Sequence, residues 1–130
     1  MAIEQLRQDP MMEHLISSLE QGRDIGHYGR LVFVMIARHF MSEDELLKYL
    51  MKDRDVDEQK ARSLLAQVSA RDYNPPKRER VLDWMSKQKF PICLDTADPD
   101  QCNVYKNLDF PKEIYDKIQR YYEGKVEGQA

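Results

Sequence analysis

The sequence predicts an all-α fold, a compact bundle of about six helices with one long irregular loop before the last helix. Hydrophobic residues recur at helical spacing over most of the chain, and residues suited to helix capping precede these segments. Only the stretch at about 90–109 lacks this helical spacing of hydrophobic residues. With 130 residues and 42% hydrophobic content, the chain can bury a core without the help of disulfide bonds or a structural metal ion. We expect one domain, 1–130, with a core at about 9–122.

The N-terminal half contains the starts of three expected helices. Asp9-Pro10 is typical of an N-cap followed by proline at the first helical position. The second helix covers roughly residues 26–40, the least polar run of the chain. At SEDE, Ser42 can cap a third helix while Glu45 reaches back to it, which is the capping-box arrangement.

The C-terminal half contains three more. Asp55 and Glu58 are expected to begin the fourth helix as Ser42 and Glu45 begin the third. The two prolines in RDYNPPKRER should end that helix and start the fifth. The irregular loop follows, with an Asp-Pro turn expected at 98–99. A last helix should begin at Pro111.

The composition restricts the functional class. Charged residues make up 33% of the chain, and the formal net charge is -3. This charge argues against a nonspecific polyanion binder, which is usually strongly basic, although a local basic patch remains compatible with it. No apolar run approaches the ~20 residues that cross a bilayer. MAIEQLRQDP also lacks the apolar segment of a signal peptide. We therefore expect a cytoplasmic protein without a membrane partner.

Two cysteines, Cys93 and Cys102, are too few for a disulfide scaffold. They also do not complete a zinc or iron–sulfur site, which needs about four protein ligands. We expect both thiols to be reduced and to pack the loop, and we expect no cofactor or metal. A residual metal or redox site at the two cysteines is the alternative. No catalytic constellation stands out, so we expect the chain not to be an enzyme.

The apolar segment IGHYGRLVFVMIARHF carries several basic side chains. At about 100° per residue, His27, Arg30 and Arg38 share a stripe about 80° wide. The first turn of a helix favours an anion, and Gly26 and Gly29 would leave room for a phosphate. His27 and Arg30 thus predict a small phosphate cradle. A solvated helix face is the alternative.

A second basic cluster surrounds KRER. Lys77 and Arg78 begin it, and Arg71 and Tyr73 precede it. Basic residues interleaved with aromatic ones are typical of single-strand binding, through phosphate attraction and base stacking. Ordinary surface charge at a helix start is the alternative, and we expect Trp84 to belong to the core.

Several short motifs follow one another in order. They are MMEHLISSLEQG, the HxxR sequence HYGR, the helix end ARHFM, MSEDELLKYL, DVDEQKARSLLAQV, DYNPP and a cysteine-bearing loop that ends NVYKNLDFP. This order resembles the C-terminal helical domain of the archaeal and eukaryotic DNA primase large subunit, which holds an iron–sulfur cluster. The resemblance covers about residues 9–118.

The sequence also departs from the family at the cysteine positions. Where the family has its first cluster cysteine, this chain has Met11 or Met12, and where it has the second, this chain has Lys77. The other two correspond to Cys93 and Cys102. The resemblance therefore implies a form without a cluster. Apolar side chains would then hold the loop, namely Phe90, Ile92, Leu94, Val104, Tyr105 and Phe110.

In the family, the HxxR motif and the tyrosine before the prolines contact primer-template nucleic acid and the phosphates of the initiating nucleotide. The resemblance implies this role for His27, Arg30 and Tyr73, so Arg30→Ala should weaken binding and lower its salt slope by about one. Further basic neighbours are Arg38, Arg71, Lys77 and Arg78.

A separate subunit of the family catalyses phosphoryl transfer. We therefore expect a noncatalytic module that binds DNA or a nucleotide beside a primase-type catalytic subunit or another replication protein. The alternative is a helical protein–protein interaction module that kept the fold, which exposed tyrosines at Tyr121 and Tyr122 would favour.

Overall fold

The computed structural model describes residues 2–117, and within this range the fold is all-α without strands, which confirms the predicted class. The helices are α1 (Ala2–Leu6), α2 (Pro10–Glu20), α3 (Gly26–Ala37), α4 (Glu43–Leu50), α5 (Glu58–Arg71), α6 (Arg78–Met85) and α7 (Val104–Asn107). Residues 112–117 are also helical, where the last helix was predicted. No helix in this range is both long and apolar enough to span a membrane.

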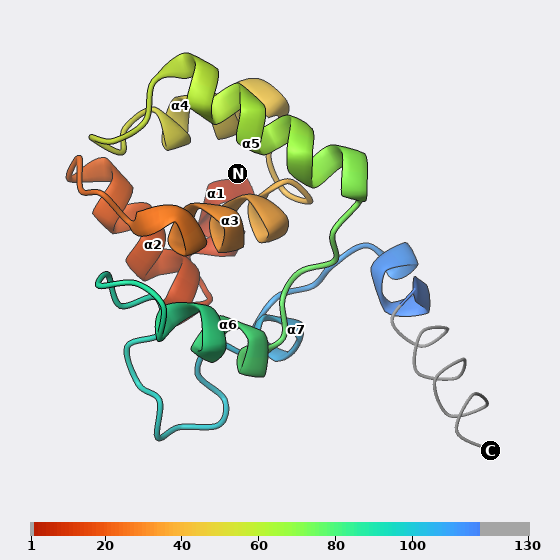
Figure 1. Cartoon of the computed structure of the whole chain (residues 1–130). Helices are drawn as coiled ribbons and strands as arrows, with labels where there is room; N and C mark the ends of the chain where they lie inside the picture. Colours follow the sequence, from red (N-terminus) through yellow and green to blue (C-terminus); the bar gives the residue numbers. More distant parts are fainter. Residues whose placement is uncertain (1, 118–130) are drawn as a thin grey trace.

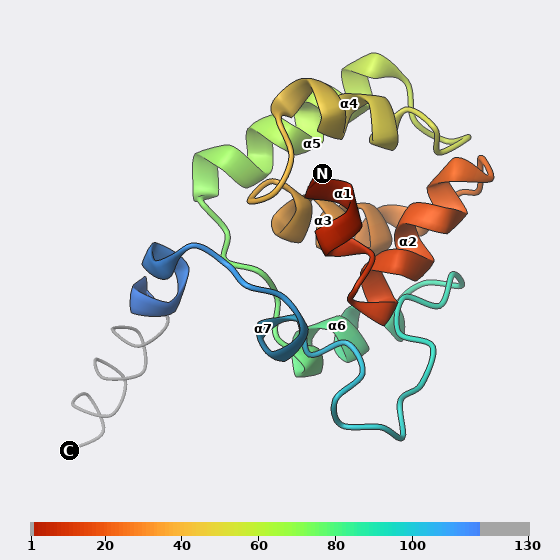
Figure 2. The ribbon, with the colours of Figure 1, turned by 180° about the vertical axis from the view of Figure 1, so that it is seen from behind.

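The helix α3 is the centre of the bundle. It packs against α2, α4, α5 and α6, and its residues 29–37 are all buried. In both ribbon views α4 and α5 lie on one side of α3 and α6 on the other (Figures 1 and 2). The least polar segment of the sequence thus occupies the middle of the fold, because apolar burial is the main favourable term in folding.

Two predicted helix starts are confirmed. The side chain of Asp9 accepts a hydrogen bond of 2.9 Å from the backbone N–H of Met12, and proline opens α2. At the start of α4, Ser42 and Glu45 form the reciprocal capping box. Asp9 is fully buried, and its second oxygen accepts a bond from the Asn107 amide, so this cap also ties α2 to the end of α7.

The start of α5 differs from the prediction. Asp57, and not Asp55, is the N-cap, and it accepts a hydrogen bond of 2.8 Å from the backbone N–H of Lys60. Asp55 instead pairs with the Lys60 ammonium at 2.8 Å. The segment before α5 has several carboxylates, so local spacing did not identify which one caps the helix.

The cysteine prediction was wrong, because Cys93 and Cys102 form a disulfide with a Cα–Cα distance of 5.9 Å. The predicted turn explains why they meet. The backbone N–H of Gln101 donates to the Asp98 carbonyl, so the chain reverses between the two cysteines. Both are buried, and no cluster of three or more metal-ligating side chains occurs in the described part of the chain.

Most of the apolar side chains expected to hold this loop do so. Phe90, Ile92, Val104 and Phe110 are buried. Leu94 is the exception, because it is 63% exposed at the surface of the loop. Tyr105, which was also expected to hold the loop, is half-buried.

Candidate functional site

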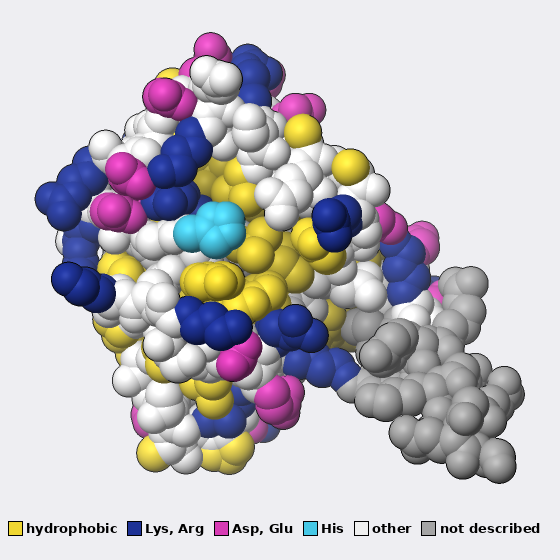
Figure 3. All heavy atoms as spheres, in the orientation of Figure 1, with side chains coloured by type: hydrophobic (Ala, Val, Ile, Leu, Met, Phe, Trp, Pro, Cys, Tyr) yellow, Lys and Arg dark blue, Asp and Glu magenta, His cyan; other side chains and the backbone are white. Residues whose placement is uncertain are grey.

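A cavity of about 450 Å³ lies between α3, the segment 72–77 and α6. We call it the aromatic pocket. Figure 3 shows hydrophobic side chains gathered between α5 and α6, with Lys and Arg side chains along the edge. The predicted residues Tyr73 and Lys77 meet in this pocket. Its lining residues are Leu31, Met35, Tyr73, Asn74, Pro76, Lys77, Glu79, Arg80 and Trp84.

Trp84 forms an aromatic wall of this pocket. It is half-buried rather than part of the core, contrary to the expectation. Its ring stacks on Tyr28 with centroids 5.8 Å apart, and the guanidinium of Arg80 lies 5.8 Å from its centroid. Arg80 and Trp84 are four residues apart on α6, a spacing that brings side chains together on a helix. That spacing was the signal that could have placed them both in the site.

A second cavity of about 450 Å³ lies beside Lys77, between the start of α6 and the disulfide loop. Arg78 lines it and donates a hydrogen bond of 2.6 Å to the Thr96 carbonyl. Tyr105 also lines it and donates to the Pro75 carbonyl, while burial raises the pKa of Tyr105 to about 12. Arg78 therefore fastens the loop to α6.

His27 is exposed in the first turn of α3 and lines a small cavity of about 180 Å³ between α3 and α5. Partial burial lowers the pKa of His27, and the charges of Arg30 and Lys60 lower it further. The imidazole is therefore neutral near pH 7, and it can bind a ligand through a hydrogen bond but not through a charge.

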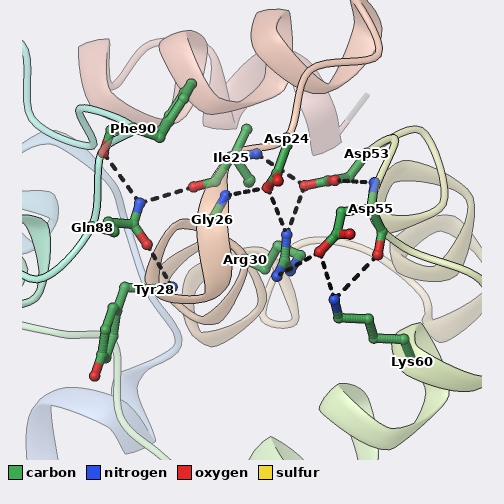
Figure 4. Close-up of polar contacts among 10 residues, drawn as sticks. All are labelled: Asp24, Ile25, Gly26, Tyr28, Arg30, Asp53, Asp55, Lys60, Gln88 and Phe90. Carbon is green, nitrogen blue, oxygen red and sulfur yellow. Dashed lines mark hydrogen bonds and ion pairs between the residues drawn. The ribbon is translucent and has the colours of Figure 1, made fainter.

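Arg30 lies inside the protein, with only 6% of its side chain exposed. Its Nη1 donates to Asp24 at 3.0 Å and to Asp53 at 3.1 Å, and its Nη2 lies 3.9 Å from Asp55 (Figure 4). The Asp53 side chain is fully buried. The guanidinium is therefore occupied by three carboxylates and joins α3 to the segment after α4. This geometry does not support the predicted phosphate contact.

The start of α3 is likewise occupied by the protein itself. The backbone N–H of Gly26 donates to Asp24, and that of Tyr28 donates to the Gln88 side chain (Figure 4). A Cβ added at Gly26, where φ is +80°, would lie 2.5 Å from the Gln88 Oε1. The room at Gly26 therefore accommodates Gln88 and not a phosphate, and at Gly29 an added Cβ would meet Ile25 at 3.3 Å.

Arg38 is also engaged within the fold. Its Nη2 donates to Asp72 and to the Tyr73 carbonyl, both at 2.8 Å. Asp72 caps the end of α5 in the left-handed conformation, and it also pairs with Lys117. Lys117 and Arg38 lower the pKa of Asp72 to about 2. Arg38 therefore holds the segment 72–77 against the end of α3.

The predicted residues are thus spread over several surfaces and do not share one pocket. Tyr73 and Lys77 line the aromatic pocket, whereas His27 and Arg30 line the small cavity. Arg71 is exposed at the end of α5 and lines neither. The two cavities are still neighbours, because His27 lies one turn before Leu31 on α3 and residues four apart share a helix face.

Comparison with curated proteins finds two similar sequences. The chain is 33% identical over 77 residues to the DNA primase large subunit PriL of Thermoplasma acidophilum, and 32% identical over 77 residues to PriL of Thermoplasma volcanium. A region of this chain is related to PriL. The match covers 55% of this chain but only 23% and 24% of the two relatives. No protein-family model and no solved structure match the chain.

The similarity to PriL supports a primase-related protein but does not assign the chain to the iron–sulfur domain of the family. The chain spans less than a quarter of the length of the relatives that it matches. Their names describe complete large subunits. An activity or partner of those subunits can therefore only be proposed for this chain.

Proposed function

We propose that this chain is a noncatalytic nucleic-acid-binding module of a primase-related protein. It binds single-stranded or primer-template DNA across the aromatic pocket. The observation that carries the proposal is the combination in one open cavity of Tyr73 and Trp84 with Lys77 and Arg80. Aromatic rings and basic side chains in one groove are the two features by which proteins hold single strands, through stacking and phosphate attraction.

The distribution of charge supports this role despite the net charge of -3. Asp24 and Asp53 are hydrogen-bonded to Arg30, and Asp72 is hydrogen-bonded to Arg38. These carboxylates are partly compensated within the fold, so their effect on an approaching strand is reduced.

Two exposed arginines are more available. Arg71 and Arg80 are exposed, and neither has an ion pair among residues 2–117. Among the residues that line the aromatic pocket, Lys77 and Arg80 outnumber the single carboxylate of Glu79. A strand that crosses this edge of α6 would therefore meet positive charge.

The proposed module supplies binding and not chemistry. The relatives are named as large subunits of DNA primase. We place phosphoryl transfer on a primase-type catalytic subunit that works beside this chain, and we place the module in DNA replication.

Titration of fluorescein-labelled single-stranded and primer-template DNA at several salt concentrations tests this function. The wild-type protein should bind at low salt, with an affinity that falls linearly on a log–log plot. Arg80→Ala and Arg71→Ala should each lower the slope by about one, because each removes one phosphate contact. Fluorescence anisotropy gives the affinities.

Arg62→Ala is the matched control. Arg62 is an exposed arginine on α5 that pairs with Glu58 and lies about half a turn around the helix from Arg71. Its removal should leave the slope unchanged. If neither DNA binds at low salt, the proposal fails and the protein-interaction module is the remaining hypothesis. Tyr121 and Tyr122, on which that hypothesis relied, lie outside the described residues.

A further inference from the structure

We propose that the aromatic pocket receives one unpaired nucleobase and that Asn74 recognises its hydrogen-bonding edge. This inference rests on the proposed function, and it names the part of the nucleic acid that enters the pocket. The base can belong to a single strand or to a free nucleotide, because both present the same ring.

The size and walls of the pocket fit a base. Its volume of about 450 Å³ falls within the range of about 300–1,000 Å³ that is usual for small-ligand sites. Leu31 and Met35 contribute apolar lining from α3, and Pro76 and Trp84 line the pocket as well. A base inside a duplex is stacked on both faces, so only an unstacked base can enter a pocket of this kind.

Asn74 contributes an unused polar group to this apolar setting. Its Oδ1 is buried and has no hydrogen-bond partner among the described residues, yet Asn74 lines the pocket. A buried acceptor without a donor is unfavourable, so a ligand that brings an N–H group would relieve this cost. The terminal torsion of asparagine is broad, so a small rotation turns the amide toward the ligand.

Nucleobases supply the required donor. Each of them carries an N–H group on its Watson–Crick edge, and proteins that bind splayed-out bases read this edge. Asn74 stands between Tyr73 and the prolines Pro75 and Pro76, whose rings restrict the backbone, so the amide is held at a defined place in the wall. An aliphatic ligand would leave the amide unpaired, which is why we favour a base.

Trp84 and Arg80 complete the binding surface. One face of Trp84 is supported by Tyr28, which holds the indole in place. Arg80 is exposed and lies over the Trp84 ring, so its guanidinium can stack on an entering base or move to the attached phosphate. Lys77 lines the same pocket and adds positive charge beside the phosphate.

The chain offers a direct probe, because Trp84 is its only tryptophan. A short oligonucleotide and an abasic strand with the same number of phosphates are titrated against the wild-type protein. The base-containing strand should quench the Trp84 emission and bind roughly tenfold more tightly, whereas the abasic strand should bind without quenching. Equal affinity and equal emission with both strands would overturn the inference.

Two variants test the role of the amide. Asn74→Ala should weaken binding of the base-containing strand by about tenfold, the contribution of one hydrogen bond, and should leave abasic binding unchanged. Asn103→Ala removes an amide from the second cavity and serves as the matched control. An unchanged affinity in Asn74→Ala would contradict the assignment of Asn74, and the wild-type comparison of the two strands does not depend on how either variant folds.

A third titration, with a free nucleoside monophosphate, distinguishes a free nucleotide from a base within DNA as the ligand of the pocket. Quenching by the mononucleotide would assign the pocket to a nucleotide, and quenching only by the strand would assign it to a base within DNA. Both results support the inference. DNA binding without any dependence on bases would refute the inference but leave the proposed function in place, whereas absence of DNA binding would refute both.

Discussion

The start of α3 and the aromatic pocket combine the same kinds of residue, a guanidinium and aromatic rings beside the first turns of a helix. They differ in what surrounds the guanidinium. Arg30 is buried and faces three carboxylates, whereas Arg80 is exposed and contacts the Trp84 ring. The sequence motif alone does not distinguish an internal ion pair from a ligand-binding cation.

The physical reason for the difference is desolvation. A guanidinium removed from water must be paired, so the fold surrounds Arg30 with Asp24, Asp53 and Asp55. A guanidinium that keeps its water needs no such partner and remains available to an anion. The contrast between the two regions can be tested by substitutions that should affect stability in one and binding in the other.

The largest effect is expected for Arg30→Met. Removing the guanidinium leaves the carboxylate of Asp53 buried without its cation, so the free energy of unfolding should fall by about 3–5 kcal/mol. Urea denaturation at pH 7 measures this. Arg62→Met breaks only the exposed pair with Glu58 and should change stability by less than about 1 kcal/mol.

Arg30→Met also tests whether Arg30 is the DNA contact predicted from the sequence or the internal ion pair found in the structure. The sequence alone predicts that loss of Arg30 lowers the salt slope of DNA binding by about one. If Arg30→Met remains as stable as the wild type and loses that contact, Arg30 belongs to the binding surface and the contrast with Arg80 disappears.

A smaller effect is expected at the glycines that have positive φ. Gly22→Ala should cost about 1–2 kcal/mol, because φ is +72° but the added Cβ has space, with its nearest neighbour the Lys52 carbonyl at 3.8 Å. Gly26→Ala has a similar φ and also collides with Gln88, so it should cost more. Thermal or urea unfolding of both variants gives the difference. Equal costs would mean that Gln88 does not fill the start of α3.

A pH-dependent effect is expected at the other end of α3. Burial and the Arg38 charge lower the pKa of His39 to about 4, with Lys117 acting in the same direction and Asp72 opposing it. Between pH 6.5 and pH 4 the unfolded chain therefore takes up a proton that the folded protein does not. The free energy of unfolding should fall across this window, by up to roughly 3 kcal/mol.

The control for this prediction is His39→Phe, which removes the titrating group beside Phe110. The difference in stability between the two proteins should vary with pH between 6.5 and 4 and level off well below 4, where the folded protein is also protonated. A difference that does not depend on pH would show that His39 has an ordinary pKa.

Half of the candidate site could be recognised from the sequence. Tyr73 and Lys77 were predicted, and both line the aromatic pocket. Trp84 was assigned to the core because a tryptophan within a helical stripe is usually buried, and Asn74 gave no signal, since its unpaired amide is visible only when its neighbours are known. His27 remains a candidate beside the pocket, while Arg30 and Arg38 are engaged in ion pairs.

The sequence by itself determined the helical class and most of the helix starts, because hydrophobic period and N-caps act over three or four residues. The Asp9 cap and the capping box at Ser42 are of this kind. Tertiary structure alone decided the Cys93–Cys102 disulfide, the carboxylates around Arg30 and the place of Gln88 at the start of α3. These contacts join residues that are distant in the chain, and which groups become buried together depends on how the helices pack.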